Sequence, residues 1–230
     1  MVQGYKDDLL FYIRDIDRYA DDGEHTRSPR RALRYLTPVD ILESFEEWVY
    51  DPIRPILYID APLNGGDSAA IPHELLEELR DRKGYPCTWF FGRDRLYFGR
   101  DENHVNPKTK FLALLCSMIV QLAALMPSTY DDVTGALTER AFDDLDEMGA
   151  NMGTIPYSIH KLIEIVKALV LLGPTTVFFV FEGCDRVVEG DQDLSRQLMN
   201  FLNYLAASQP QVSGKVWKIL WIASKPSTPI

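Results

Sequence analysis

From residue 55 onward, short apolar runs alternate with longer segments that repeat apolar residues at helical spacing. This alternation indicates a parallel sheet whose strands are joined by crossover helices. The apolar runs predict strands at residues 56–59, 88–91, 176–181 and 217–223. The periodic segments predict helices at residues 73–82, 108–126, 157–172 and 192–207. Because the last two strands are apolar on both faces, we expect a doubly wound, mostly parallel α/β fold with helices on both sides of the sheet.

Residues 1–50 are predicted to form a helical extension with a linker, ahead of an α/β domain at residues 51–230. The first apolar stripe at helical spacing consists of Leu9, Tyr12, Ile13 and Ile16. A polar, arginine-containing linker is expected at residues 21–34. A second helix is expected to begin at Thr37, with Pro38 in its first turn and a capping contact from Asp40. The buried stripe of this helix is predicted to be Ile41, Phe45, Trp48 and Val49.

Composition and charge narrow the classes of partner. The chain has 230 residues, of which 46% are apolar and 25% are charged, and these proportions are those of an ordinary globular protein. The 24 basic and 34 acidic residues give a net charge of −10. A surface of this sign repels phosphate backbones and anionic lipids, so we expect neither nucleic acid nor a membrane surface as a partner.

The cellular compartment of the protein is predicted from its apolar segments and its cysteines. Asp7 and Asp8 interrupt the first apolar run, so no secretory leader is expected. The most apolar stretch, residues 111–126, is shorter than the roughly 20 residues that span a bilayer, and it is predicted to be a buried helix. The three cysteines are widely spaced, which favours a reducing, cytoplasmic compartment over a disulfide framework.

No familiar metal-binding pattern is present in the sequence. Neither the cysteines nor the histidines have the paired spacing of a zinc site, and the histidines are predicted to be surface or half-buried residues: His25, His73, His104 and His160. Residues 131–147 contain seven acidic residues and a single arginine. They lack the glycine-centred alternation of a calcium loop, so we expect a solvated acidic excursion.

A glycine-rich loop follows the first predicted strand, in the sequence Ile56-Leu-Tyr-Ile-Asp-Ala-Pro-Leu-Asn-Gly-Gly-Asp-Ser68. A strand, a glycine-rich loop and a helix also make up the phosphate-binding loop GxxxxGK[ST], in which backbone amides hold the phosphates and lysine neutralises them. On that template Ala61 takes the first glycine position, Gly66 follows Gly65 at the second, Asp67 replaces the lysine and Ser68 supplies the hydroxyl. Proline at 72 predicts that the helix either kinks or begins late.

Three further segments occur in the order expected of a nucleotide-binding domain. Val177-Phe-Phe-Val-Phe-Glu182-Gly-Cys-Asp185-Arg186 is similar to a Walker B strand, and Lys218-Ile-Leu-Trp-Ile-Ala-Ser224-Lys225-Pro226 to a sensor strand. Phe90-Phe91 followed by the helix at 111–125 is similar to a third segment, which reads FF…SLL..QL…P in one group of such domains. With these motifs, residues 37–230 resemble the STAND class of P-loop NTPases. The resemblance is to the NACHT or nephrocystin-like N-terminal domains of fungal receptor-like proteins.

The resemblance implies a nucleotide site whose key charges are changed. Where the family has DALDE, this chain has Glu182, Gly183, Cys184, Asp185 and Arg186, so the final catalytic acid is replaced by a cation. Where the family has SSRP, the chain has Ser224 and Lys225 after Ala223. The family also continues into a further strand, a helical lid and a winged helix, which are expected to be absent here.

We therefore expect a degenerate domain that works by contacting other proteins or domains of a larger receptor-like assembly, with little or no NTP hydrolysis. Asp67 and Arg186 are predicted to close the pocket with an ion pair, within roughly 6 Å of each other. A carboxylate about 4 Å from a phosphate oxygen costs about 4 kcal/mol at an effective dielectric constant near 20. Nucleotide binding is accordingly predicted to be very weak, with no cofactor.

Two alternatives remain from the sequence. One is a signalling switch that binds ATP or GTP weakly, with magnesium held by Ser68 and Glu182. The other is a serine esterase with Ser68 as the nucleophile, because Gly66-Asp67-Ser68-Ala69-Ala70 is similar to the GDSAG elbow. That elbow requires the strand to end at the glycine, whereas three residues intervene here, and the last histidine is His160.

Overall fold

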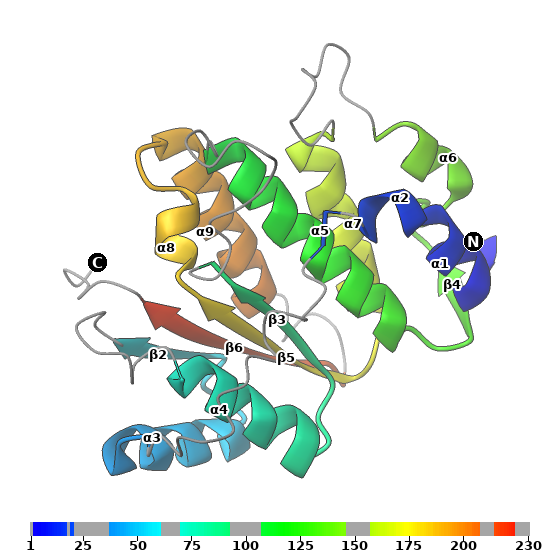
Figure 1. Cartoon of the computed structure of the whole chain (residues 1–230). Helices are drawn as coiled ribbons and strands as arrows, with labels where there is room; N and C mark the ends of the chain where they lie inside the picture. The colour runs from blue at the N-terminus through cyan, green and yellow to red at the C-terminus, as the bar shows by residue number, and fades with distance from the viewer. Residues whose placement is uncertain are drawn as a thin grey trace.

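Four parallel strands form the central sheet of the computed structural model. The structure describes residues 2–17, 19–20, 37–60, 70–92, 107–145, 157–207 and 214–223. Across the sheet the order is β2-β6-β5-β3 (Figure 1). The strand bounds are Ile56–Asp60 for β2, Cys87–Phe91 for β3, Thr176–Glu182 for β5 and Val216–Ala223 for β6. The four predicted strands are thus confirmed to within a residue at each end.

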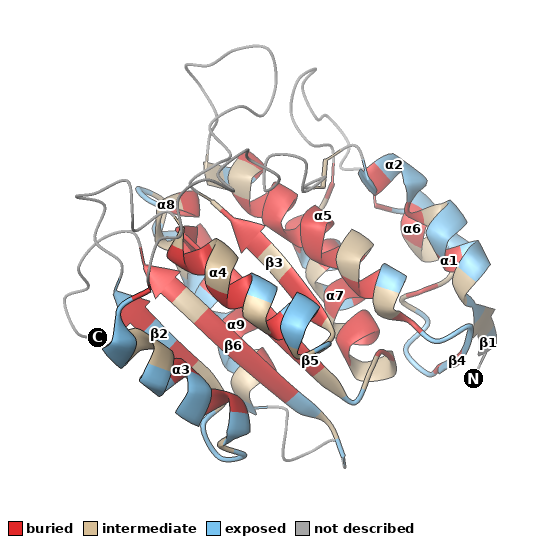
Figure 2. Ribbon diagram, turned by 60° about the horizontal axis from the view of Figure 1, so that its bottom comes forward, coloured by how far each residue is buried: buried red, intermediate tan, exposed pale blue. Residues whose placement is uncertain are grey.

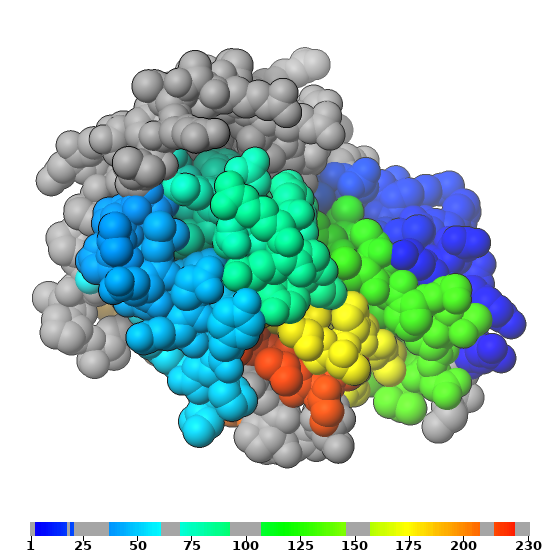
Figure 3. Space-filling model, turned by 90° about the horizontal axis from the view of Figure 1, so that it is seen from below, coloured from blue at the N-terminus to red at the C-terminus, as the bar shows by residue number. Residues whose placement is uncertain are grey.

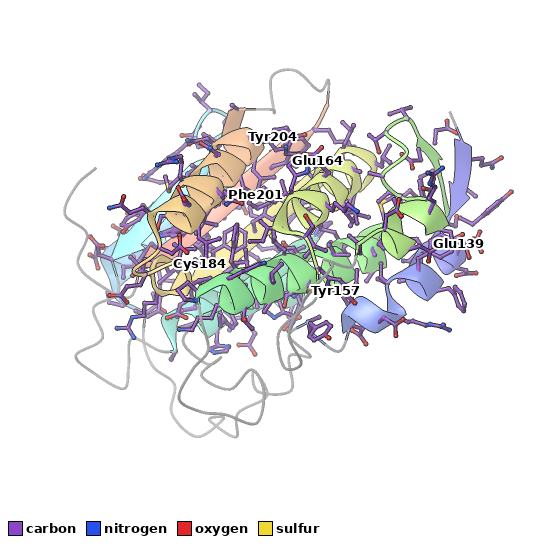
Figure 4. All side chains as sticks on the ribbon, turned by 90° about the horizontal axis from the view of Figure 1, so that it is seen from above. Glu139, Tyr157, Glu164, Cys184, Phe201 and Tyr204 are labelled. Atoms are coloured by element: carbon purple, nitrogen blue, oxygen red, sulfur yellow. The ribbon has the colours of Figure 1, made fainter. Side chains whose placement is uncertain are left out.

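Helices cover both faces of this sheet, which confirms the predicted α/β architecture. On one face lie α3 (Val39–Tyr50), α4 (Ile71–Glu77) and the π-helical turn η3 (Glu78–Arg82). On the other lie α5 (Pro107–Leu125), α7 (Ile159–Leu172) and α9 (Gln192–Ala207), side by side in Figure 4. Each face has its own hydrophobic core, because alternate residues of β5 and β6 point to opposite sides. The four predicted crossover helices are confirmed.

Helix α5 is apolar on almost every side because it is packed against other elements all around. It contacts β3, α7 and the N-terminal helices, and Phe111, Leu115 and Ile119 are fully or almost fully buried. By length and composition it is the single described helix that could cross a membrane, but 67% of its most apolar window is buried inside the protein. The prediction of a buried helix here is confirmed.

The N-terminal segments pack against opposite faces of the sheet. The first of them, β1 (Val2–Tyr5), α1 (Lys6–Tyr12) and α2 (Arg14–Asp17), lie near α5, whereas α3 covers β2. The expected capping box at Thr37 is wrong. Its N–H and hydroxyl instead donate to the carboxylate of Glu74 in α4, and α3 begins at Val39 after an extended Pro38. The predicted stripe is confirmed at Phe45, Trp48 and Val49, and Ile41 is half-buried. Figure 2 shows α3 at the margin of the molecule, with exposed positions along much of its outer side.

A second, two-stranded sheet was not predicted. In it β4 (Thr129–Asp132) pairs antiparallel with β1, and α6 (Glu139–Asp143) follows. The expectation of a wholly solvated acidic excursion is therefore wrong at Asp132, which is 4% exposed. Its Oδ1 accepts hydrogen bonds from the N–H and hydroxyl of Thr134 and from Gly135 N–H, and its Oδ2 accepts one from Leu137 N–H. This carboxylate organises the turn that leads into α6.

Asp132→Asn is expected to lower the free energy of unfolding at neutral pH by about 1–2 kcal/mol, because the amide nitrogen would face a backbone N–H. Burial raises the pKa of Asp132, but the hydrogen bonds from Thr134, Leu137 and Gly135 together lower it by more, so the net pKa lies below the ordinary value. The carboxylate therefore stabilises the fold above the unfolded pKa of about 3.9, and this contribution is lost as the pH falls through the folded pKa.

Urea unfolding at neutral and acidic pH measures this effect. The wild type should lose more stability on acidification than Asp132→Asn does, whereas Asp131→Asn, at the exposed neighbouring position, should behave like the wild type. Equal acid sensitivity of the wild type and Asp132→Asn would show that the Asp132 turn does not contribute in this way.

Candidate functional site

The four parallel strands end together at one side of the sheet, which we call the carboxyl edge. The last residues of β2, β6, β5 and β3 are Asp60, Ala223, Glu182 and Phe91. The chain leaves β2 toward α4 on one face, and it leaves β5 toward α8 (Cys184–Val187) and α9 on the other. Figure 1 shows the arrowheads of the strands, with α8 beside them. In open α/β sheets, ligands bind beyond the carboxyl ends where the connections diverge in this way. The topology therefore selects this edge as the candidate site.

At the end of β5, backbone hydrogen bonds join the strands β3, β5 and β6. Gly183 has φ 66°, the left-handed conformation that glycine adopts readily, and its N–H donates to Ile222 O of β6 at 3.0 Å. On the other side, Gly92 N–H donates to Glu182 O at 2.7 Å. Gly92 has no room for a side chain, because a Cβ there would lie 2.9 Å from Gly183 O. Gly92 is not among the residues predicted from the sequence, although a glycine directly after a buried strand could have indicated it.

The side chains carried by this turn differ in charge and burial. Glu182 is 2% exposed, whereas Asp185 and Arg186 are half-buried in α8. The Nε of Arg186 is buried and has no hydrogen-bond partner in the described part of the chain. Burial, followed by the charges of Glu182 and Asp185, raises the pKa of the Cys184 thiol well above its usual value. Cys184 is therefore a poor nucleophile. The turn carries a buried carboxyl group at Glu182 and, four residues later, a half-buried cation at Arg186.

Helix α4 begins late, as its proline predicts. Its first residue is Ile71, Pro72 lies in the first turn, and the preceding Ala70 provides no side-chain cap. His73 is half-buried, and its ring lies 4.4 Å from the ring of Phe91 at the carboxyl edge. His160, on α7, is exposed, so both histidines have the burial that was expected of them.

Much of the predicted nucleotide site lies outside the described residues. This applies to Ala61, Gly65, Gly66, Asp67, Ser68, Ser224 and Lys225. The predicted ion pair between Asp67 and Arg186 and the predicted magnesium pair of Ser68 with Glu182 therefore stay predictions. The same holds for Ser68 as an esterase nucleophile. Of the predicted set, the structure brings together Glu182, Asp185 and Arg186.

The described ranges do not contain the arrangement of a metal site. Within those residues, no three histidine, cysteine, aspartate or glutamate side chains are grouped so that they could hold a metal ion. All three cysteines, Cys87, Cys116 and Cys184, are buried thiols. Among the described residues that end the four strands, Glu182 is the buried carboxyl group.

Comparisons with known proteins do not show a family for this chain. No protein-family model matches the chain, and no curated protein or solved structure gives a match. The residues of the carboxyl edge themselves therefore carry the functional interpretation.

Proposed function

We propose that this chain is a degenerate P-loop NTPase domain of the STAND type, in which a protein-contact role has replaced nucleotide hydrolysis. The strand order supports the proposal, because it brings the ends of β2, β6 and β5 side by side. The strand β2 leads into the glycine-rich loop, β5 belongs to the Walker B-like segment, and β6 belongs to the sensor-like segment. In this proposal the domain serves as a scaffold within a larger, cytoplasmic, receptor-like assembly.

The observation that carries the proposal is the charge at the end of β5. Arg186 lies in α8, four residues after the buried Glu182 that ends β5, at the position where the resembling family has its catalytic acid. A guanidinium cannot accept a proton from an attacking water, so hydrolysis by the family mechanism is lost. In the loop after β2, the lysine position is occupied by Asp67, which repels phosphate instead of neutralising it.

The late start of α4 is a second, independent support. Helix N-termini bind phosphate through free backbone N–H groups directed at the ligand. Here Pro72 has no N–H, and α4 begins three residues after Ser68. The amides that would hold a phosphate are therefore displaced along the chain, which weakens nucleotide binding beyond the effect of charge alone.

Charge restoration tests the proposal. The double variant Asp67→Lys with Arg186→Glu should bind a fluorescent Mg-ATP analogue at least about tenfold more tightly than the wild type, because one repulsive contact becomes attractive. As the matched control, Asp81→Lys with Arg80→Glu makes the same exchange in an exposed ion pair on η3 and should leave the affinity unchanged. Equal affinity of the wild type and the charge-restored variant would contradict the charge-loss explanation.

A second candidate function is a weak ATP- or GTP-binding switch, with magnesium held by Ser68 and Glu182. One observation favours it, namely the buried Nε of Arg186, which has no acceptor among the described residues. A buried donor without a partner is unusual, and an anion is a suitable acceptor for it. In this case Arg186→Ala should weaken the binding of Mg-ATP to the wild-type loop, whereas in the scaffold proposal there is no such binding to weaken.

A further inference from the structure

Lys218 of β6 is a buried cation whose hydrogen bonds, among the described residues, all go to backbone carbonyl groups. Its Nζ donates to Trp48 O at 2.6 Å, to Arg54 O at 3.1 Å and to Asp51 O. Each of the three N–H groups of the ammonium therefore has an acceptor. Burial lowers the pKa of Lys218, and the negative charge of Asp51 opposes this shift. The carbonyl oxygens thus replace the water that a buried ammonium loses.

The three carbonyl groups are positioned by backbone that is fixed without Lys218, and we call their oxygens the α3 carbonyl site. Trp48 O belongs to the last turn of α3, where the helix dipole favours a cation. After the helix, the Asp51 carboxylate accepts from Ile53 N–H at 2.8 Å and from Arg54 N–H at 3.3 Å. An aspartate that bonds the backbone in this way holds a turn in one conformation. The turn continues into β2, whose ladder with β6 fixes its other end.

An aromatic ring lies beside the same ammonium group. The centre of the Trp48 ring is 5.3 Å from the Nζ of Lys218, which is within the range of a cation–π interaction. The ring is fully buried and packs edge-on against Phe178, with ring centres 5.6 Å apart. Phe178 is also the register partner of Lys218 between β5 and β6. The oxygens accept the N–H groups and the ring attracts the charge, a combination that suits a primary alkylammonium ion.

The α3 carbonyl site lies close to the surface of the molecule. The turn above it consists of exposed residues, and Ile53 is 87% exposed. In Figure 3 the end of α3 and the residues after it appear as a blue to cyan surface beside the orange start of β6. A small ion therefore has a short way to travel from water to the three oxygens.

We propose that the α3 carbonyl site is a binding site for primary alkylammonium ions, which the wild-type chain fills with its own Lys218. Truncation of Lys218 to alanine removes the atoms of n-propylammonium and leaves their place beside the three carbonyl groups. Dissolved n-propylammonium is therefore expected to occupy this place and to restore the anchoring of α3. The inference is independent of the proposed scaffold function, because no residue of the carboxyl edge takes part in it.

The test follows the urea unfolding of Lys218→Ala while n-propylammonium chloride is added. A ligand that binds the folded state raises the folding equilibrium constant, and at about 100 mM the rise should be roughly tenfold for a dissociation constant of about 10 mM. If the variant is unfolded in plain buffer, the same rise is measured as a gain of folded protein by circular dichroism. In the control Lys218→Met an apolar chain of similar size fills the space, so n-propylammonium should raise the constant less than about twofold.

A series of solutes separates recognition of the ammonium group from simple filling of the space. The neutral n-propanol has nearly the same shape without the charge, and tetramethylammonium has the charge without N–H donors. Both should stabilise Lys218→Ala at least about fivefold less than n-propylammonium does. Lys215→Ala is the matched control for the site, because Lys215 is half-buried and donates to two carbonyl groups, Gly173 O and Pro174 O. It should show no saturable stabilisation.

The wild-type protein provides a readout that requires no substitution. In NMR spectra of the isotope-labelled protein, the ammonium protons of Lys218 should exchange with water at least about tenfold more slowly than those of the exposed Lys161. Exchange that is equally fast at both residues would overturn the inference. So would equal stabilisation of Lys218→Ala by n-propylammonium and n-propanol, because space filling alone would then explain the effect. Absence of any stabilisation by n-propylammonium would overturn it as well.

Discussion

Gly92→Ala is expected to lower the free energy of unfolding by about 3 kcal/mol, because the added methyl group meets backbone that cannot easily move. A Cβ at this position would lie 2.9 Å from Gly183 O and 3.1 Å from Glu182 O. Both carbonyl groups belong to the turn that joins β3, β5 and β6, so relief of the clash requires a shift of the end of β5. Glu182 and Arg186 would move with it.

Chemical denaturation of the wild type and two glycine variants measures the effect. Gly84→Ala is the matched control, because Gly84 has φ 69° but, apart from its chain neighbours, no atom of the described residues lies within 4 Å of the place that its added methyl group would take. It should therefore lose only about 1 kcal/mol, the cost of a left-handed alanine. If Gly92→Ala loses no more than Gly84→Ala, the close approach of β3 to β5 is not a constraint on the fold.

Lys218→Met is expected to lower the free energy of unfolding by a similar amount, about 3 kcal/mol, because three backbone carbonyl groups at and after the end of α3 lose a charged hydrogen-bond donor. Lys218 lies on β6 and is 2% exposed. Its Nζ donates to Trp48 O at 2.6 Å, to Arg54 O at 3.1 Å and to Asp51 O. The ammonium group also lies 5.3 Å from the centre of the Trp48 ring. It thereby ties the end of α3 and the following turn to the sheet.

Lys215→Met is the matched control for Lys218. Lys215 is half-buried and donates to Gly173 O and Pro174 O, so its loss should cost about 1 kcal/mol. Hydrogen exchange should show faster opening of α3 in Lys218→Met than in Lys215→Met. If the two variants are equally stable and α3 is equally protected in both, Lys218 does not anchor the helix.

The main sheet and its helices could be predicted because their signal is local. The apolar runs of β5 and β6 and the long apolar helix α5 are visible in the sequence alone. The pairing of β1 with β4 could not be predicted, because both strands are short and partly polar and their partners are about 127 residues apart. The burial of Asp132 and the bond from Thr37 to Glu74 likewise depend on tertiary contacts that no spacing encodes.

The candidate site was predictable in part. The parallel order of elements indicates that the residues after each strand meet at one edge, and Glu182, Asp185 and Arg186 do lie there. The importance of Gly92 could not be predicted, because it comes from the close approach of the backbone after β3 to the backbone at the end of β5. The place of each strand in the sheet is not specified by the sequence pattern either.

Calorimetric titration of the whole chain with Mg-ATP and with Mg-GTP tests the central claim most directly, because it measures whether the carboxyl edge still accepts a triphosphate. We predict a dissociation constant weaker than about 10 μM for both nucleotides, or no saturable heat at all. A dissociation constant below about 10 μM for either one, equivalent to roughly −7 kcal/mol, would contradict the loss of nucleotide binding.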